Sequence, residues 1–185
     1  MLLGTAYSQS ENLQQSVETF ETVLKEDEGS HDARFRLASV YKELLALDQA
    51  LSHLEILIKA EYKLPESCRM RGDILFDRRQ FAEAASDYEA AIRADKNNPI
   101  NSMIAERLVQ SLLEIGDLKR GEEYLALLDQ SPTKGFFEAE KVLQSGDLAR
   151  VAVVVESLRK NAPFDVRSHV LYGRLKLKDG TTEKA

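Results

Sequence analysis

Small and apolar residues recur along the chain at an interval of 34 residues, and the residues between them alternate with charge at helical spacing. Five sets of positions keep this interval. They are Gly4, Ala38 and Gly72; Tyr7, Tyr41 and Leu75; Leu13, Leu47 and Phe81; Ser16, Ala50 and Ala84; and Phe20, Leu54 and Tyr88. Agreement of five registers at one period predicts a chain built from repeated helical units.

Prolines and glycines mark two kinds of break in this pattern. The prolines Pro65, Pro99, Pro132 and Pro163 are 34, 33 and 31 residues apart, and proline is accepted in the first turn of a helix but not in its interior. Glycines at 116, 146 and 180 fall between two apolar runs, where glycine can end a helix. Each unit is therefore predicted to be a helix, a glycine-type turn, a second helix and a proline-containing turn.

This 34-residue unit resembles the tetratricopeptide repeat, on small, aromatic and alanine positions such as Gly72, Phe81, Ala84 and Tyr88. The resemblance implies an all-α, right-handed α-solenoid (superhelix) of antiparallel helix pairs, with about ten to twelve helices and no sheet. It divides the chain into a partial first repeat (1–30), repeats 2 (31–64) and 3 (65–98), an irregular repeat 4 (99–131), repeat 5 (132–165) and a truncated repeat 6 (166–185).

The fourth repeat departs from the regular spacing. The tripeptide Gly-Asp-Leu occurs at 116–118 and again at 146–148, which is 30 residues later and not 34. We therefore expect a shortened second helix or exit turn before residue 132. We also expect Asn98 and Pro99 to act as N-cap and first residue of a first helix with three extra residues.

Composition excludes several classes of function. The chain has 185 residues, 43% of them hydrophobic, and a net charge of -6, which argues against a nucleic-acid binder. One cysteine, Cys68, allows neither an internal disulfide nor a thiolate metal cluster, and we expect it to be a small residue packed between helices. His53 is expected to be a packing or surface residue. No catalytic motif is found, so we expect no enzyme, no cofactor, no metal and no membrane span, in either a cytoplasmic or a periplasmic setting.

Function is expected on the concave surface, which the resemblance implies is lined by the first helix of each repeat. Arginine and aromatic residues at these positions could meet the acidic and apolar groups of a protein segment. The candidate groove residues are Phe35, Arg36, Ser39, Lys42, Arg69, Met70, Asp73, Phe76, Arg107, Gln110, Phe136 and Arg174. The alternative for Met70 and Phe136 is that both are core residues between repeats.

Two functions of different classes remain open. The first is a protein-protein interaction scaffold that binds a protein or peptide partner with acidic groups in the concave groove. The second is a structural or regulatory arm of a larger enzyme or of a secretion or assembly machine. The positions at which some tetratricopeptide proteins clamp chaperone tails hold Thr5, Ser39, Glu66 and Met70 here, which disfavours that activity. Val170, Leu171, Leu175 and Leu177 near the truncated end predict an uncovered edge and self-association through it.

Overall fold

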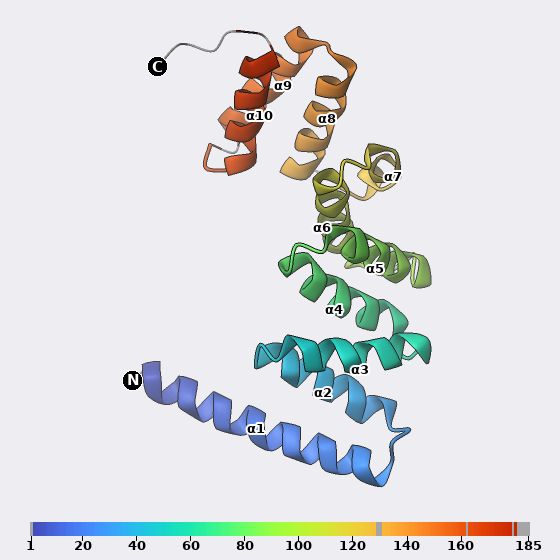
Figure 1. Ribbon diagram of the computed structural model, residues 1–185. Coiled ribbons are helices and arrows are strands. Elements are labelled where there is room, and N and C mark those ends of the chain that lie inside the picture. The colour runs from blue at the N-terminus through green and yellow to red at the C-terminus, as the bar shows by residue number, and fades with distance from the viewer. Residues whose placement is uncertain (1, 129–130, 162, 179, 181–185) are drawn as a thin grey trace. The chain divides into compact units, whose positions relative to one another are not determined.

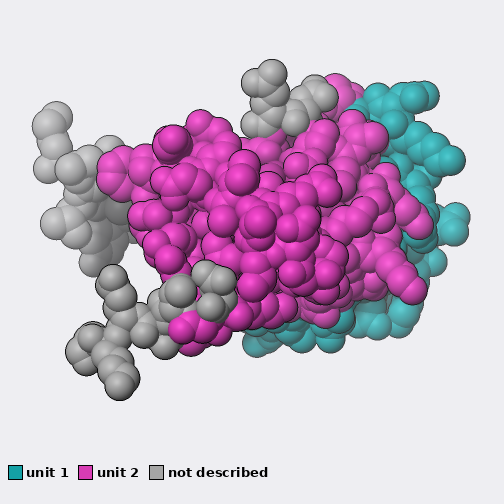
Figure 2. Space-filling model, turned by 90° about the horizontal axis from the view of Figure 1, so that it is seen from above, with its two compact units in different colours: residues 1–98 teal, residues 99–185 magenta. Residues whose placement is uncertain are grey.

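A computed structural model describes the backbone of residues 2–128, 131–161, 163–178 and 180, and within these ranges the side chains from residue 12 onward. These residues form ten α-helices and one 3-10 helix, with no strand among them (Figure 1). The all-α prediction is therefore confirmed. The helices group into two compact units, residues 1–98 and 99–185, which Figure 2 colours separately. Each unit is described by itself.

Unit 1 contains α1 (Leu2–Glu26), α2 (His31–Glu43), α3 (Leu47–Lys59), α4 (Leu64–Asp77) and α5 (Phe81–Ala94). Successive helices run antiparallel and stack as pairs, as the repeat pattern predicts (Figure 1). The apolar faces of α2, α3 and α4 meet in a core that includes Ala38, Leu54, Leu57, Met70 and Ile74. Because no single pair can bury its apolar faces alone, each pair is stabilised by its neighbour.

The small positions of the repeat allow helices to approach closely. Gly72 on α4 faces the ring of Tyr88 on α5, and a Cβ atom added to Gly72 would lie 2.9 Å from the Tyr88 Cε1 atom. Tyr88 itself is fully buried. The small residue and the large residue therefore fill one space, as the 34-residue register predicts.

The first repeat does not contain the predicted turn, because α1 is one continuous helix. In later repeats this turn places one residue in the left-handed region: Leu45 (φ 58°) and Arg79 (φ 60°) in unit 1, and Gly116 and Gly146 in unit 2. The position 34 residues before Leu45 is residue 11, which lies inside α1. The side chain of Tyr7, a register position, lies outside the described residues.

Unit 2 contains α6 (Asn101–Glu114), α7 (Leu118–Glu122), the 3-10 helix η1 (Leu125–Leu127), α8 (Pro132–Ser145), α9 (Leu148–Asn161) and α10 (Val166–Lys178). Its core joins the last three helices through Phe136, Ala139, Leu143, Val151, Val155, Leu158, Leu171 and Leu175. The predicted uncovered edge is therefore only partly correct. Leu171 and Leu175 are buried, whereas Val170 and Leu177 are exposed.

The irregular repeat 4 has the predicted short second helix, since α7 has only five residues and η1 follows it. The prediction for its first helix is wrong. α6 begins at Asn101 and has 14 residues, the same number as α4. The preceding segment forms a turn in which the Asp95 carboxylate accepts a hydrogen bond from the backbone N–H of Asn97 and the Asp95 carbonyl accepts one from the backbone N–H of Asn98. This turn places Pro99 before the helix and not in its first turn.

Within the described part of the chain, no helix has the length and apolar character needed to cross a membrane.

Candidate functional site

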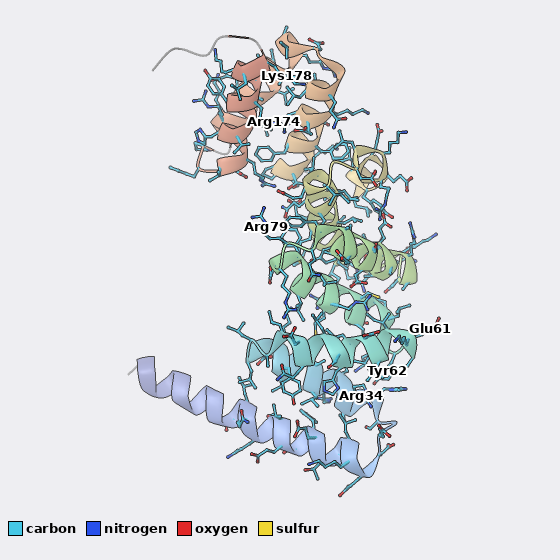
Figure 3. The ribbon with its side chains drawn as sticks, viewed as in Figure 1. Arg34, Glu61, Tyr62, Arg79, Arg174 and Lys178 are labelled. Carbon is cyan, nitrogen blue, oxygen red and sulfur yellow. The ribbon has the colours of Figure 1, made fainter. Side chains whose placement is uncertain are left out.

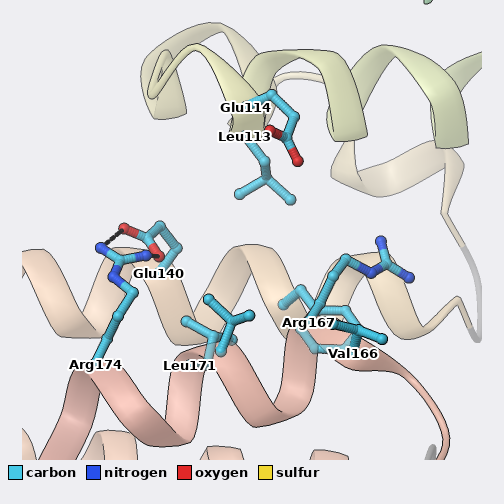
Figure 4. Close-up of a pocket in the computed structure, with 9 residues that line it drawn as sticks. Leu113, Glu114, Glu140, Val166, Arg167, Leu171 and Arg174 are labelled. Atoms are coloured by element: carbon cyan, nitrogen blue, oxygen red, sulfur yellow. Dashed lines mark hydrogen bonds and ion pairs between the residues drawn. The ribbon is translucent and has the colours of Figure 1, made fainter. Parts of the chain in front are cut away.

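The first helices of unit 2 surround a groove with a volume of about 360 Å³ (Figure 4). It is lined by Leu113 and Glu114 of α6, Phe136 and Glu140 of α8, and five residues of α10. These helices are the first helices of repeats 4, 5 and 6, from which the sequence analysis predicted the groove. We call this the α6/α8/α10 groove.

The floor and one lip of the groove are apolar. Phe136 and Leu171 are 3% and 6% exposed and belong to the core of unit 2, so the floor is rigid. Val166 and Val170 of α10 line the same groove and are 72% and 54% exposed. An apolar side chain that enters the groove would therefore be removed from water, and so would the exposed apolar surface of Val166 and Val170. Removal of apolar surface from water is the main favourable contribution to binding in such sites.

Opposite charges at the rim are paired within the chain. Both terminal nitrogens of Arg174 donate to the Glu140 carboxylate, over 2.5 and 2.8 Å, as the dashed lines in Figure 4 mark. This hydrogen bonding raises the pKa of Arg174. The pair joins α10 to α8, and a ligand carboxylate would have to compete with Glu140 for the guanidinium.

A second arginine covers the floor. The guanidinium of Arg167 lies 4.4 Å from the centre of the Phe136 ring, a cation–π distance. It also donates to the Asp165 carboxylate, at 2.7 Å from the nearer terminal nitrogen, and this lowers the pKa of Asp165. Another terminal nitrogen lies 3.3 Å from the Thr133 hydroxyl. Arg167 is thus held from three directions.

A polar network fixes the start of α8 beside α6. The hydroxyls of Ser131 and Thr133 both donate to the Glu106 carboxylate, and the side-chain amide of Gln110 donates to the same carboxylate at 3.0 Å. Ser131 is also the N-cap of α8, accepting a hydrogen bond from the backbone N–H of Thr133. The predicted groove residue Gln110 therefore positions the site's helices and does not line the groove.

In unit 1 the predicted residues fall on α2 and α4. Lys42 and Arg69 both bind the Asp73 carboxylate, at 3.4 and 3.2 Å, so these three residues connect α2 with α4. Arg36 pairs with Asp32 at 2.9 Å. We call this set the α2/α4 surface; it also includes the half-buried residues Phe35 and Ser39.

Several predicted residues have other surroundings. Met70 is 7% exposed and lies in the core of unit 1, and Phe136 belongs to the core of unit 2 while also forming the groove floor. Phe76 packs edge to face against Phe81, with ring centres 5.4 Å apart. Arg107 is half-buried on α6.

Sequence reasoning missed three apolar lining residues, Leu113, Val166 and Val170, and one cation, Lys63. The Lys63 ammonium lies 4.8 Å from the centre of the Phe35 ring and 3.1 Å from Asp32. The available signal was the apolar spacing of α10. Val166, Val170 and Leu177 fall on the face opposite the buried Leu171 and Leu175, so the helix is apolar on two sides.

The remaining reactive side chains have structural surroundings. Cys68 is buried, as predicted, and burial raises the pKa of its thiol to about 11, so it is a poor nucleophile at neutral pH. His53 stacks on Tyr41 with ring centres 5.7 Å apart, and its Nδ1 atom lies 3.5 Å from a terminal nitrogen of Arg34. Arg34 is buried and is labelled in Figure 3. Across the described residues, no group of three or more His, Cys, Asp or Glu could hold a metal ion.

Comparison with known proteins agrees with this architecture. A family model described as "Tetratricopeptide repeat-like domain" matches residues 1–117, well over half of the chain. The chain belongs to the tetratricopeptide repeat family. No curated protein matches it.

Solved tetratricopeptide repeat structures share the fold at low sequence identity. YrrB, whose structure is described as a TPR protein with an unusual peptide-binding site, is 15% identical with a TM-score of 0.63, covering 90% of this chain and 87% of YrrB. PilF of Pseudomonas aeruginosa is 20% identical with a TM-score of 0.61, over 97% and 82% of the two chains. PilW, a type IV pilus biogenesis factor, is 19% identical with a TM-score of 0.60, over 98% and 84%.

Proposed function

We propose that the chain is a non-catalytic interaction scaffold that binds a segment of a partner protein in the α6/α8/α10 groove. The observation that carries the proposal is a groove whose apolar floor lies beside two exposed valines, Val166 and Val170. The groove volume suits one or two large apolar side chains, which would anchor an extended or helical segment. The peptide-binding site named for YrrB and the biogenesis role named for PilW support a binding role in general terms.

Charge has a secondary part in this proposal. Arg36, Arg69 and Arg174 each pair with a carboxylate of the chain, so a partner's acidic groups would exchange with these carboxylates. Exchange of one ion pair for another in water changes the free energy little, because exposed pairs contribute about 0–1 kcal/mol. We therefore expect apolar contact to set the affinity, and acidic groups on the partner to set orientation and the dependence on salt.

The α2/α4 surface is proposed as a second contact region. Phe35, Arg36, Lys42 and Arg69 present one aromatic ring and three cations on first helices of unit 1. Aromatic and arginine residues are the side chains whose truncation most often weakens protein interfaces.

The experiment is a pull-down with the intact chain, identification of the bound protein, and titration of that protein against two matched variants. Val170→Asp places a charge at the lip of the groove, and we expect it to weaken binding at least about tenfold by removing apolar contact and adding a desolvation cost. Leu177→Asp introduces the same charge at an exposed apolar residue of α10 that lies outside this groove. It should leave binding unchanged. If both variants weaken binding equally, or if neither weakens it, the partner does not bind in the α6/α8/α10 groove.

A structural or regulatory arm remains the second candidate, and one observation favours it. Ion pairs of the predicted groove residues join neighbouring first helices, Lys42 to Asp73 and Arg174 to Glu140, which is what a stiff spacer needs. In that case the intact chain would capture no protein through either first-helix surface. Charge reversal of Arg174 would then lower the melting temperature without changing any association.

A further inference from the structure

Unit 2 has a second groove, between the beginning of α8 and the end of α9. Its volume is about 420 Å³, and its lining includes Pro132, Gly135, Glu138, Val153, Val154 and Leu158. It shares no residue with the α6/α8/α10 groove. Val153 is 71% exposed at its edge.

The helices that form this groove repeat a helix pair of unit 1. Residues of α8 and α9 lie 67 positions after their counterparts in α4 and α5. On this count Pro65 and Pro132 are both in the first two residues of a helix, and Arg79 and Gly146 both have a left-handed backbone. Buried residues also correspond, as Tyr88 and Val155 do.

In unit 1 the corresponding place is beside α3. Arg71 of α4 donates two hydrogen bonds, of 2.7 and 2.6 Å, to Asp87 of α5. Glu55 of α3 is near enough to this pair for the charge of Arg71 to lower its pKa, although its hydrogen bond with Lys59 lowers that pKa most. The apolar faces of α3 and α4 meet in the core of unit 1, so α3 lies beside α4.

Burial agrees with this arrangement. Cys68, the counterpart of Gly135, is 1% exposed, and Asp87, the counterpart of Val154, is 4% exposed. The 13-residue helix α3 thus packs against α4 of the α4/α5 pair in unit 1.

In unit 2 the helix that precedes α8 is too short to fill this place. α7 has five residues and is followed only by the 3-10 turn Leu125–Leu127 (Figure 1). The chain passes from the start of α7, Leu118, to Pro132 in 14 residues, whereas it takes 18 from Leu47 to Pro65. The missing turns of helix leave Gly135 and Val154 half-buried, where their counterparts Cys68 and Asp87 are buried.

We infer that this α8/α9 groove binds an amphipathic helix of a partner protein, which takes the place that α3 has in unit 1. Charge defines the helix further. Glu138 stands at the position of Arg71, so the sign of the charge facing the docked helix is reversed. The partner helix therefore presents apolar residues at intervals of three and four, with a lysine or arginine where α3 has Glu55.

A second copy of the chain cannot supply α3 itself. Leu54 and Leu57, which form the apolar face of α3, are fully buried in their own unit. Releasing them would require unfolding of that repeat, so the occupant comes from another protein.

The probe is a synthetic peptide of residues 47–61, held helical by a side-chain bridge between the exposed positions Asp48 and Ser52. Two versions are titrated against the intact chain by fluorescence anisotropy: the natural sequence and the Glu55→Lys peptide. We expect saturable binding, with the Glu55→Lys peptide about fivefold tighter, the difference between a like and an opposite exposed pair. Glu138→Lys in the chain should reverse this preference. Glu83→Lys, an equal charge change on the exposed surface of α5, should not.

Val153→Asp should weaken both peptides at least tenfold, whereas Val170→Asp should leave them unchanged. If this result is not obtained, the proposed function of the α6/α8/α10 groove still stands, because the two variants test the two grooves separately. The inference is overturned if neither helical peptide binds or if Glu138→Lys does not reverse the preference. It is also overturned if sedimentation shows a self-association that Val153→Asp abolishes, since the occupant would then be a second copy.

Discussion

Replacing Gly72 with alanine adds one methyl group at the closest approach of two helices. The new Cβ atom would lie 2.9, 3.1 and 3.2 Å from three atoms of the Tyr88 ring. Tyr88 cannot easily move away, because it is fully buried and its hydroxyl donates to Asp73 at 3.0 Å. Either the ring leaves this hydrogen bond or α4 and α5 separate.

The expected cost follows from overpacking. Insertion of a carbon into a close-packed site destabilises by about 1–3 kcal/mol. For a chain of this length that corresponds to a fall in melting temperature of about 2–12 °C. The control is Gly173→Ala on α10, where an added Cβ would meet nothing within 4 Å. There the same substitution should stabilise, by about 0.5–1 kcal/mol, because alanine favours a helix over glycine.

The assay is urea unfolding of both variants, followed by fluorescence and circular dichroism. A double-mutant cycle with Tyr88→Leu tests the mechanism, since a smaller side chain makes room for the methyl group. In the Tyr88→Leu background the Gly72→Ala change should cost less than in the natural chain. Equal midpoints for Gly72→Ala and Gly173→Ala, or an unchanged cost in the cycle, would refute this account of the helix contact.

Two further predictions concern backbone strain and pH. Leu45, with φ 58°, is exposed, so Leu45→Gly should stabilise by about 0.5–1 kcal/mol, whereas Gly146→Ala should destabilise by about 1 kcal/mol; thermal melting checks both signs. Burial lowers the pKa of His53 below 6.5, aided by the charge of Arg34 and opposed by Glu21, so the neutral ring is favoured in the folded state. Its contribution to stability is present above pH 6.5 and is lost as the pH falls below that value, and urea midpoints of His53→Gln should therefore change less between pH 8 and pH 5. Parallel pH profiles for the two proteins would contradict this.

Helix pairs and their close contacts could be predicted from sequence because they depend on local spacing. The interval between Gly72 and its partner Tyr88 fixes which faces meet, and the shorter spacing before Pro132 shows that repeat 4 lacks helix. The first repeat could not be predicted in this way. In repeats 2 and 3 the turn forms at a leucine and an arginine, Leu45 and Arg79, and not at a glycine. The residue type at position 11 therefore does not reveal whether the chain turns there or continues as a helix.

Site residues were harder to predict, because their burial and their ion-pair partners depend on contacts between helices. The sequence placed Arg174 on a first helix, but not its pairing with Glu140 34 residues earlier. Met70 had two predicted positions, the groove and the core between repeats, and the structure places it in the core. The exposed Val170 was assigned to an uncovered edge, because part of the adjoining floor, Phe136, comes from another helix, α8.

The most direct test of the central claim is methyl NMR of the intact chain titrated with the partner identified by pull-down. If the segment binds in the α6/α8/α10 groove, the methyl signals of Leu113, Val170 and Leu171 shift together and saturate at one concentration. The methyl signals of Val153, which lines the α8/α9 groove, do not shift unless a helical peptide that binds that groove is also added. Shifts absent from the three groove residues while the partner is bound would contradict the proposal.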